Sequence, residues 1–208
     1  MSVLLSFWRP QHLFESKFNK FAAFATGGEF CHTDIVLCVH TDTLKDAITS
    51  AMATEEPQLN AMIEESFFAD PVARRKLGIS DYVYVSFSAL WGQQLQARVL
   101  RDTASTAWEH TPVEHEDVEF ITVKGIQNVD AVCHYCVMQL GKDYDIASAL
   151  FSVTGSECAW LSTPNKKFCS ELCVLALQED GILEDVKAAS VTPNSLFQHI
   201  TKWNLSVE

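Results

Sequence analysis

The order of strand-like and helix-like segments along the 208-residue chain is the feature that most constrains its fold. Residues 32–40 and 81–89 are dense in β-branched and aromatic side chains, which predicts two buried strands. Weaker strand patterns occupy residues 94–100 and 118–123. From residue 127 onward, apolar residues recur three and four positions apart, as they do in helices. This segregation predicts an α+β fold rather than alternating βαβ units.

Helices are predicted in three parts of the chain. Residues 10–25 space four phenylalanines three or four positions apart, which predicts an amphipathic helix with an apolar stripe. Residues 41–80 are helical in pattern with a break at an Asp-Pro pair, and we expect this block to be an insertion or a helical excursion. Thr192 followed by Pro193 favours a helix start. The last three helices are expected at 127–140, 168–181 and 192–203.

Composition predicts one domain that covers residues 1–208. Hydrophobic residues make up 48% of the chain and charged residues 20%, so the chain can bury a sizeable core. The formal net charge of -12 repels phosphate groups and anionic lipids, so we expect neither nucleic acid nor an anionic membrane surface as a partner. No segment approaches the roughly 18 apolar residues that span a bilayer, and we expect no signal peptide.

The seven cysteines are an odd number for a chain of this size. This favours free thiols in a reducing compartment, such as the cytoplasm, over a disulfide framework. Cys133 and Cys136 have CxxC spacing, and zinc binding by Cys169, Cys173 and His32 is an alternative. Cys133 and Cys136 fall on the apolar face of a predicted helix, so we interpret them as core residues and expect no metal or other cofactor.

Cys169 stands at the start of the helix predicted at 168–181. A helix N-terminus presents unpaired N–H groups and the positive end of the helix dipole, which favours a thiolate. The thiolate is the nucleophilic form, so this position points to a nucleophile, although an unplaced cysteine is more often a small buried hydrophobe. His32 stands at the start of the strand predicted at 32–40, where a base can face a helix N-terminus. Sequence separation alone cannot pair the two residues.

Four segments occur in an order that resembles a known family: FCHTDIVL at 30–37, GKDYDIASALF at 141–151, KKFCSELCVLALQEDG ending at 181, and VTPNSLFQHI at 191–200. The set resembles the circularly permuted NlpC-type branch of the papain-like cysteine hydrolases. That branch includes YiiX-like proteins and is related to the lecithin:retinol acyltransferase group. The matching segments cover about the first fifth and the last third of the chain.

The resemblance implies a papain-like fold in which an antiparallel sheet packs against a nucleophile-bearing helix. It also implies hydrolysis or transfer at an amide or ester bond through a thioester, with Cys169 as the nucleophile and His32 as the base. The substrate class stays open among a peptide, a peptidoglycan fragment, a lipid ester and a ubiquitin-like conjugate.

The resemblance places the third, polar residue on the next strand, where this chain offers Ser86 and Ser88. Asp34, His40 or a backbone carbonyl are the alternatives. The resemblance also places Tyr144 and Asp145 in a loop beside the site. The backbone N–H groups of Ser170 and Cys169 are candidates for an oxyanion hole, because they lie in the first turn of a predicted helix.

An alternative function is that of a structural or interaction protein that retains the fold with little or no activity. Permuted members of the superfamily also occur in large DNA viruses, so the alternative includes a component of a virus particle or of another protein assembly. The discriminating observation is geometric: whether the Cys169 sulfur meets the His32 ring, and whether an open groove leads to the pair.

Overall fold

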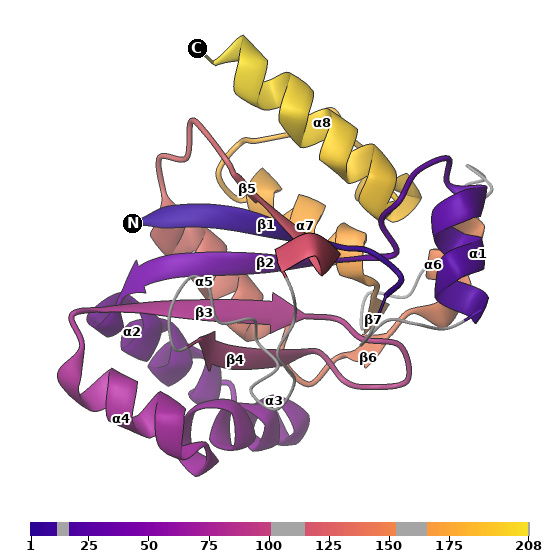
Figure 1. Cartoon of the computed structure of the whole chain (residues 1–208). Helices are drawn as coiled ribbons and strands as arrows, with labels where there is room; N and C mark the ends of the chain where they lie inside the picture. The colour runs from indigo at the N-terminus through magenta and orange to yellow at the C-terminus, as the bar shows by residue number, and fades with distance from the viewer. Residues whose placement is uncertain (12–16, 101–114, 153–165, 208) are drawn as a thin grey trace.

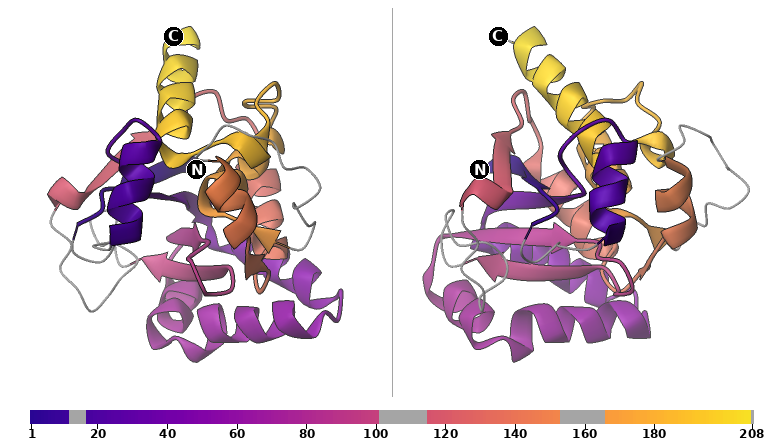
Figure 2. Two further views of the ribbon diagram at one scale, coloured as in Figure 1. Left: turned by 90° about the vertical axis from the view of Figure 1, so that its right-hand side faces the viewer. Right: turned by 45° about the vertical axis from the view of Figure 1, so that its right-hand side comes forward.

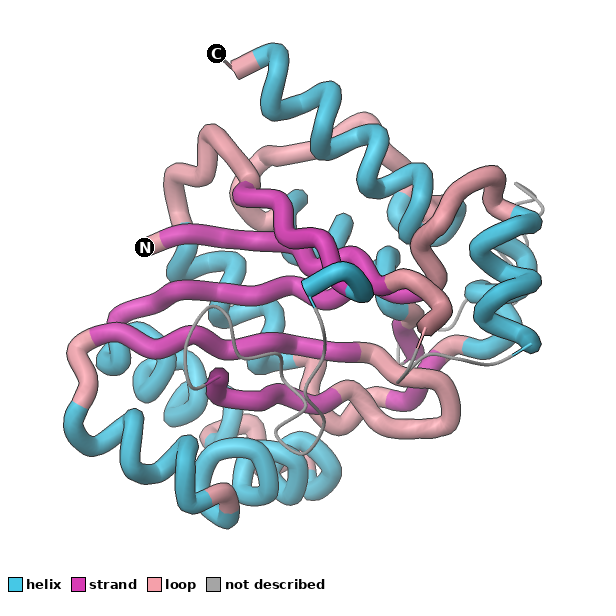
Figure 3. The backbone as a smooth tube through the Cα atoms, viewed as in Figure 1, coloured by secondary structure: helices cyan, strands magenta, loops and turns pink. Residues whose placement is uncertain are grey.

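The computed structural model describes residues 1–11, 17–100, 115–152 and 166–207. It has an α+β architecture built on a five-stranded antiparallel sheet with strand order β4-β3-β2-β1-β5 (Figure 1). Figure 3 shows the sheet as one twisted layer with helices around it. The strands are β1 Ser2–Trp8, β2 His32–His40, β3 Tyr82–Ser88, β4 Gln96–Leu100 and β5 Val118–Thr122. The four strands predicted from the sequence are therefore confirmed.

The strand β1 corrects the predicted order, which begins with a helix. β1 lies between β2 and β5, with Leu5 opposite Ile35 and Trp8 opposite His32 in the antiparallel register. Val3, Leu5 and Phe7 are fully buried, and Ser6 and Trp8 on the other face are buried as well. A short strand that is covered on both faces lacks apolar-polar alternation, so its period does not distinguish it from other apolar runs.

The block at 41–80 is helical, as its pattern predicts. Asp70 caps the last helix of the block, with its carboxylate accepting the Val72 N–H at 2.8 Å, and Pro71 takes the first helical position. That the block is an insertion stays a prediction. Its elements are α2 Thr41–Met52, α3 Pro57–Ile63, the π-helix η2 Glu64–Ala69 and α4 Pro71–Ile79.

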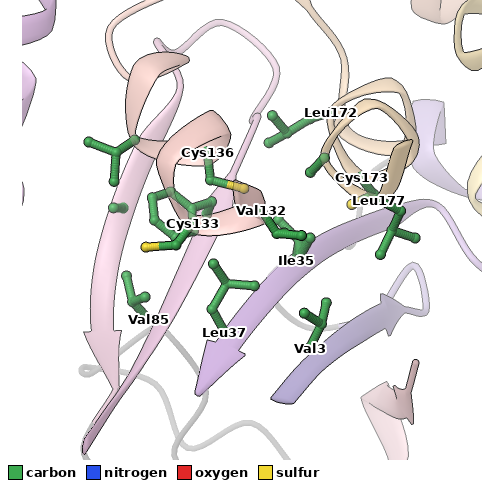
Figure 4. Packing of buried hydrophobic residues seen from close by; sticks show 14 of the residues in the cluster. Val3, Ile35, Leu37, Val85, Val132, Cys133, Cys136, Leu172, Cys173 and Leu177 are labelled. Carbon is green, nitrogen blue, oxygen red and sulfur yellow. The ribbon is translucent and has the colours of Figure 1, made fainter. Parts of the chain in front are cut away.

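One face of the sheet packs against α5 (Val129–Met138) and α7 (Cys169–Gln178). Figure 4 shows Ile35 and Leu37 of β2 directed toward side chains of both helices. The last helix, α8 (Pro193–Ser206), starts at Thr192 as predicted, and it adds Leu196 and Ile200 to the same core. The predicted helices at 127–140, 168–181 and 192–203 are confirmed.

The end of the molecule beside β6 and β7 was not anticipated. β6 (Asp143–Tyr144) and β7 (Lys166–Lys167) form a two-stranded parallel sheet, and α6 (Ile146–Ser152) follows β6. In Figure 2, α6 and the N-terminal helix α1 (Lys17–Ala25) lie at this end of the molecule. Two short 3₁₀ turns, η3 His115–Asp117 and η4 Ala188–Ser190, complete the described elements.

The helix expected at 10–25 is present as α1, but part of its predicted apolar stripe is exposed. In the described part of the chain, the relative exposures of Phe21 and Phe24 are 63% and 82%, whereas Ala23 is buried. Phe14 lies outside the described residues. The periodicity therefore predicted the helix that is present at Lys17–Ala25, and Phe21 and Phe24 of its apolar stripe do not face the core. Within the described ranges, every helix is too short or too polar to cross a bilayer.

Candidate active site

Cys169 occupies the first turn of α7, as the sequence predicts. The preceding residue, Phe168, is extended, and its N–H donates to Glu171 Oε2 at 3.4 Å, so the helix start is held by a side chain three residues on. Lys167 Nζ lies 3.4 Å from Glu171 Oε1 and partly balances that carboxylate. The first N–H groups of a helix have no partner within the helix. The Cys169 sulfur thus sits beside donors that suit a negative charge.

The packing of α7 on β2 sets the position of Cys169 along the sheet. Thr33 Oγ1 lies 3.9 Å from the Cys173 sulfur. Cys169 is four residues before Cys173 and therefore on the same side of α7, one turn nearer the helix start. His32 directly precedes Thr33, at the end of the sheet where α7 also begins (Figure 1). The contact between Thr33 and Cys173 therefore places the first turn of α7 next to His32.

Asp34 is the residue that binds the His32 ring. Its Oδ1 lies 2.7 Å from His32 Nε2, and both side chains are at least 94% buried. The two residues are two apart on β2, so their side chains leave the same face of the strand. An ionised carboxylate only accepts hydrogen bonds, so Nε2 carries the proton of this bond. Nδ1 is then the ring nitrogen left for Cys169.

The pKa of His32 reports the surroundings of the ring. Burial lowers this pKa, but the electrostatic influence of Asp34 and Cys169, together with hydrogen bonds to both residues, raises it to about 10. The hydrogen bond to Cys169 joins the two residues that sequence separation could not pair. A charged imidazole beside a thiolate is the resting state of a cysteine nucleophile.

The other candidates for the third residue are distributed along β2 and β3. Ser88 Oγ lies 3.3 Å from His32 Nε2, so Ser88 is also at the ring. Ser86 is two residues before Ser88 on β3, opposite Val36 and Arg98. His40 is at the far end of β2, about 26 Å from His32 at the usual rise of a strand, and there its Nδ1 accepts the Asp42 N–H and caps α2. The structure thus brings Asp34 and Ser88 to His32, and His40 is a capping residue instead.

Tyr144, on β6, lies beside Cys169. Burial raises the pKa of its hydroxyl well above the usual value, and the charge of Cys169 and a hydrogen bond to it raise this pKa further. Tyr144 therefore keeps its proton beside the sulfur. Asp145 accepts hydrogen bonds from the Ser148 N–H at 2.9 Å and the Ser148 hydroxyl at 2.8 Å, so it caps α6. Ser170 donates its hydroxyl to the Val191 carbonyl at 2.6 Å.

The segment at 191–200 binds the backbone just before His32. Asn194 Oδ1 accepts the Phe30 N–H, and Asn194 Nδ2 donates to the Phe30 carbonyl, both at 2.9 Å. A Cβ atom on Gly28 would lie 2.2 Å from Asn194 Oδ1, so this approach requires glycine. Asn194 and the turn that contains Gly28 are more than 160 residues apart in the sequence. Together they fix the backbone at Phe30, two residues before His32.

A small cavity adjoins Cys169. Cys169, Cys31, Tyr144 and Thr192 are among its lining residues, and its volume is about 40 Å³. A water molecule needs roughly 10–15 Å³ on this measure, so the cavity holds a few waters. Cys169 is 4% exposed. Burial is the main cause that raises the pKa of the neighbouring Cys31 thiol to about 12, so Cys31 stays protonated.

Among the remaining cysteines, Cys133 and Cys136 are packing residues of the core. Cys133 and Cys136 are fully buried on α5, in the core as predicted, and burial raises the pKa of Cys133 to about 12. The six cysteines of the described ranges are free, and Cys158 lies outside those ranges. Within the described part of the chain, no group of three or more His, Cys, Asp or Glu side chains is arranged to hold a metal ion.

Sequence reasoning missed two polar side chains of the site, Ser6 and Trp8 on β1. Both are buried, and both contact Asp34. A serine inside an otherwise apolar N-terminal run is the one signal that could have indicated them. It becomes informative only when the run is paired with β2.

Comparisons with protein-family models, with curated proteins and with solved structures found no match. The family resemblance of the four segments therefore stays a prediction.

Proposed function

We propose that this protein is a cysteine-dependent hydrolase or acyltransferase with a papain-like fold of the permuted NlpC type, acting on an amide or ester bond. The observation that carries the proposal is the chain of contacts from Cys169, in the first turn of α7, through the His32 ring to Asp34. A nucleophile, a base bonded to it, and a third group that orients the base are the parts that covalent catalysis requires.

The proposed reaction starts from the thiolate of Cys169 and the imidazolium of His32. The sulfur forms a bond to the substrate carbonyl carbon, and the carbonyl electrons move to the oxygen. As the tetrahedral intermediate collapses, the leaving amine or alcohol takes the proton from His32, which leaves a thioester on Cys169. Water, or an acceptor alcohol or amine, then attacks the thioester and gives its proton to His32. The carbon–sulfur bond breaks, and the thiolate and imidazolium return.

The start of α7 supports the same proposal. The oxyanion of the intermediate needs preorganised donors, and the backbone N–H groups of Cys169 and Ser170 lie in the first helical turn. The bond from Ser170 Oγ to the Val191 carbonyl holds this turn in place. Asp34 orients the imidazole and stabilises its charged form, as the carboxylate of a catalytic triad does.

Alkylation with iodoacetamide at pH 6, followed by peptide mapping, tests the proposal. We expect Cys169 to react at least about 100-fold faster than Cys38, since at this pH an ordinary thiol is almost entirely protonated. Cys38 is the internal reference, because it lies on the same strand as His32 and is half-buried. The Cys169→Ala variant should lose the fast phase and Cys38→Ala should keep it. Equal rates at the two cysteines would refute the proposal.

One observation favours the second candidate, a structural or interaction protein such as a component of a virus particle. The cavity at Cys169 is about 40 Å³, whereas sites for small-molecule ligands are typically ~300–1,000 Å³. Electrophiles of graded size separate the two functions. An enzyme that opens around its substrate reacts with a bulky peptidyl or acyl chloromethyl ketone as well as with iodoacetamide. A protein that has only kept the fold reacts with the small reagent alone.

A further inference from the structure

Two side chains of β1 meet the carboxylate of Asp34 on the face of β2 from which the His32 and Asp34 side chains leave. In the antiparallel register, Ser6 lies opposite Asp34 and Trp8 lies opposite His32. The relative exposures of Ser6, Trp8 and Asp34 are 1%, 2% and 1%, so the cluster is out of contact with bulk water. Side chains in such cross-strand positions reach both the directly opposite and the diagonal neighbour.

The hydrogen bonds assign a separate task to each carboxylate oxygen of Asp34. Trp8 Nε1 lies 3.0 Å from Asp34 Oδ2 and 3.0 Å from Ser6 Oγ, and Ser6 Oγ lies 3.4 Å from the same Oδ2. The indole N–H only donates, so the direction of its bonds is unambiguous. Oδ2 is thereby bound by β1, and Oδ1 is the oxygen that receives His32 Nε2 at 2.7 Å.

We propose that Trp8, with Ser6 beside it, is a positioning residue for the Cys169–His32 pair, acting through the second oxygen of Asp34. This inference rests on the function proposed above. A buried carboxylate with one free oxygen rotates toward any other donor, and an unsatisfied buried acceptor is costly. With Oδ2 bound to Trp8, the carboxylate plane is fixed and the His32 ring is kept with Nδ1 toward the sulfur.

A buried tryptophan also fills space, and the test has to separate the N–H group from the ring. Trp8→Phe keeps an aromatic ring and removes the donor. Trp203→Phe is the matched control, because Trp203 Nε1 makes one bond of 2.9 Å to the Lys124 carbonyl, on α8 and away from the site. The two variants lose the same chemical group, and only one of them loses it at Asp34.

The readout is the pH dependence of iodoacetamide alkylation at Cys169. We expect Trp8→Phe to react about tenfold more slowly than wild type at pH 6, where ionisation of the thiol depends on a well-placed imidazole. Above about pH 10 the two rates should converge, because a thiol ionises there without help from a base. Asp34→Asn should show the same pattern with a larger difference at pH 6. Trp203→Phe should follow the wild-type curve, and Cys133 should stay unreactive throughout.

An unchanged pH profile in a folded Trp8→Phe protein overturns the proposal, as does a slowing that is equal at pH 6 and pH 10, which a purely structural role produces. If Trp8→Phe exposes Cys133 to alkylation, the protein has unfolded. The alkylation profile of the Ser6→Ala variant then tests the proposal instead. That variant should slow alkylation about twofold at pH 6 and converge with wild type above pH 10, and a wild-type curve for it overturns the proposal.

A second readout does not depend on a reactive Cys169. In a Cys169→Ala background, Asp34→Asn should move the Trp8 indole N–H resonance upfield and speed its exchange with solvent, because a neutral amide is a weaker acceptor than a carboxylate. If Cys169 proves no more reactive than Cys38, the proposed function fails. The Trp8 resonance still tests the bond between Trp8 and Asp34 independently of that outcome. An unmoved Trp8 resonance removes the bond on which the inference depends.

Discussion

Cys169 at the start of α7 and Cys133 in the middle of α5 are the same residue type, and both are buried against the same sheet. Cys169 is 4% exposed and Cys133 is 0% exposed. Around Cys133 the apolar core and the charge of Asp130 both oppose a thiolate, and the pKa of Cys133 rises to about 12. Around Cys169 lie a helix N-terminus and the His32 ring, which Asp34 holds.

The difference between the two sites teaches that burial by itself does not decide what a cysteine does. A buried thiol with apolar neighbours is a packing residue. A thiol buried to nearly the same degree, but beside an imidazole and unpaired N–H groups, has partners for its negative charge. Each of the following changes alters one side of this comparison.

Removing the imidazole should have the largest effect. In His32→Gln the side chain keeps hydrogen-bonding groups but cannot carry the proton or the positive charge. We expect alkylation of Cys169 at pH 6 to fall about 10³-fold, within the range for a lost acid–base group, so that Cys169 becomes as unreactive as Cys133. Alkylation quenched at a series of times, followed by peptide mapping, measures the rates at both cysteines in one sample. A rate at Cys169 that survives this change would mean that the helix start alone activates the thiol.

The charged ring should also make stability depend on pH. The pKa of His32 is raised from 6.5 to about 10, so the folded protein holds this proton more tightly than the unfolded chain. Its contribution is therefore complete below about pH 6.5 and is lost as the pH rises through about 10, on the order of a few kcal/mol. Urea unfolding at pH 6 and at pH 10 measures the loss. His32→Gln should flatten the difference, and a wild-type protein as stable at pH 10 as at pH 6 contradicts the assignment.

A polar atom placed at Cys133 should cost stability and leave the reactive site intact. Cys133→Ser puts a hydroxyl among the apolar side chains of α5 and the sheet, which we expect to reduce the free energy of unfolding by about 2 kcal/mol. Cys38→Ser is the control, because Cys38 is half-buried and should change stability by less than about 0.5 kcal/mol. Urea unfolding gives both values. The alkylation rate of Cys169 should match wild type, and a slower rate would show that the two regions are coupled.

The smallest expected effect is at the glycine turn before His32. The added Cβ of Gly28→Ala would lie 2.2 Å from Asn194 Oδ1, so the bonds between Asn194 and Phe30 have to shift. We expect a loss of about 1 kcal/mol in unfolding free energy and a twofold to threefold slower Cys169. Gly78→Ala is the matched control: nothing lies within 4 Å of its Cβ, and it should gain a few tenths of a kcal/mol within α4. A neutral Gly28→Ala would show that the turn does not position His32.

Several elements and the key cysteine could be predicted from the sequence because their signals are local. The runs that became β2 and β3 are dense in β-branched and aromatic residues, and α7 ends near a glycine with positive φ. Cys169 could be placed in the first helical turn from the residues around it alone. The exposed Phe21 and Phe24 mark the limit of such reasoning, because a period predicts a helix but does not say which neighbour will cover its face.

The sequence by itself determined which side chains could supply the chemistry: a thiol at a helix start, a histidine at a strand start, and a short set of polar residues for the third position. Only the tertiary structure decided that Asp34 binds the ring, that His40 caps a helix far from it, and that Ser6 and Trp8 bind Asp34 in turn. The physical reason is that these choices depend on how the strands and helices pack, and the contacts of Ser6 and Trp8 depend on the register between β1 and β2. A shift of one residue would send Ser6 and Trp8 to the opposite face of the sheet, and no local pattern records that register.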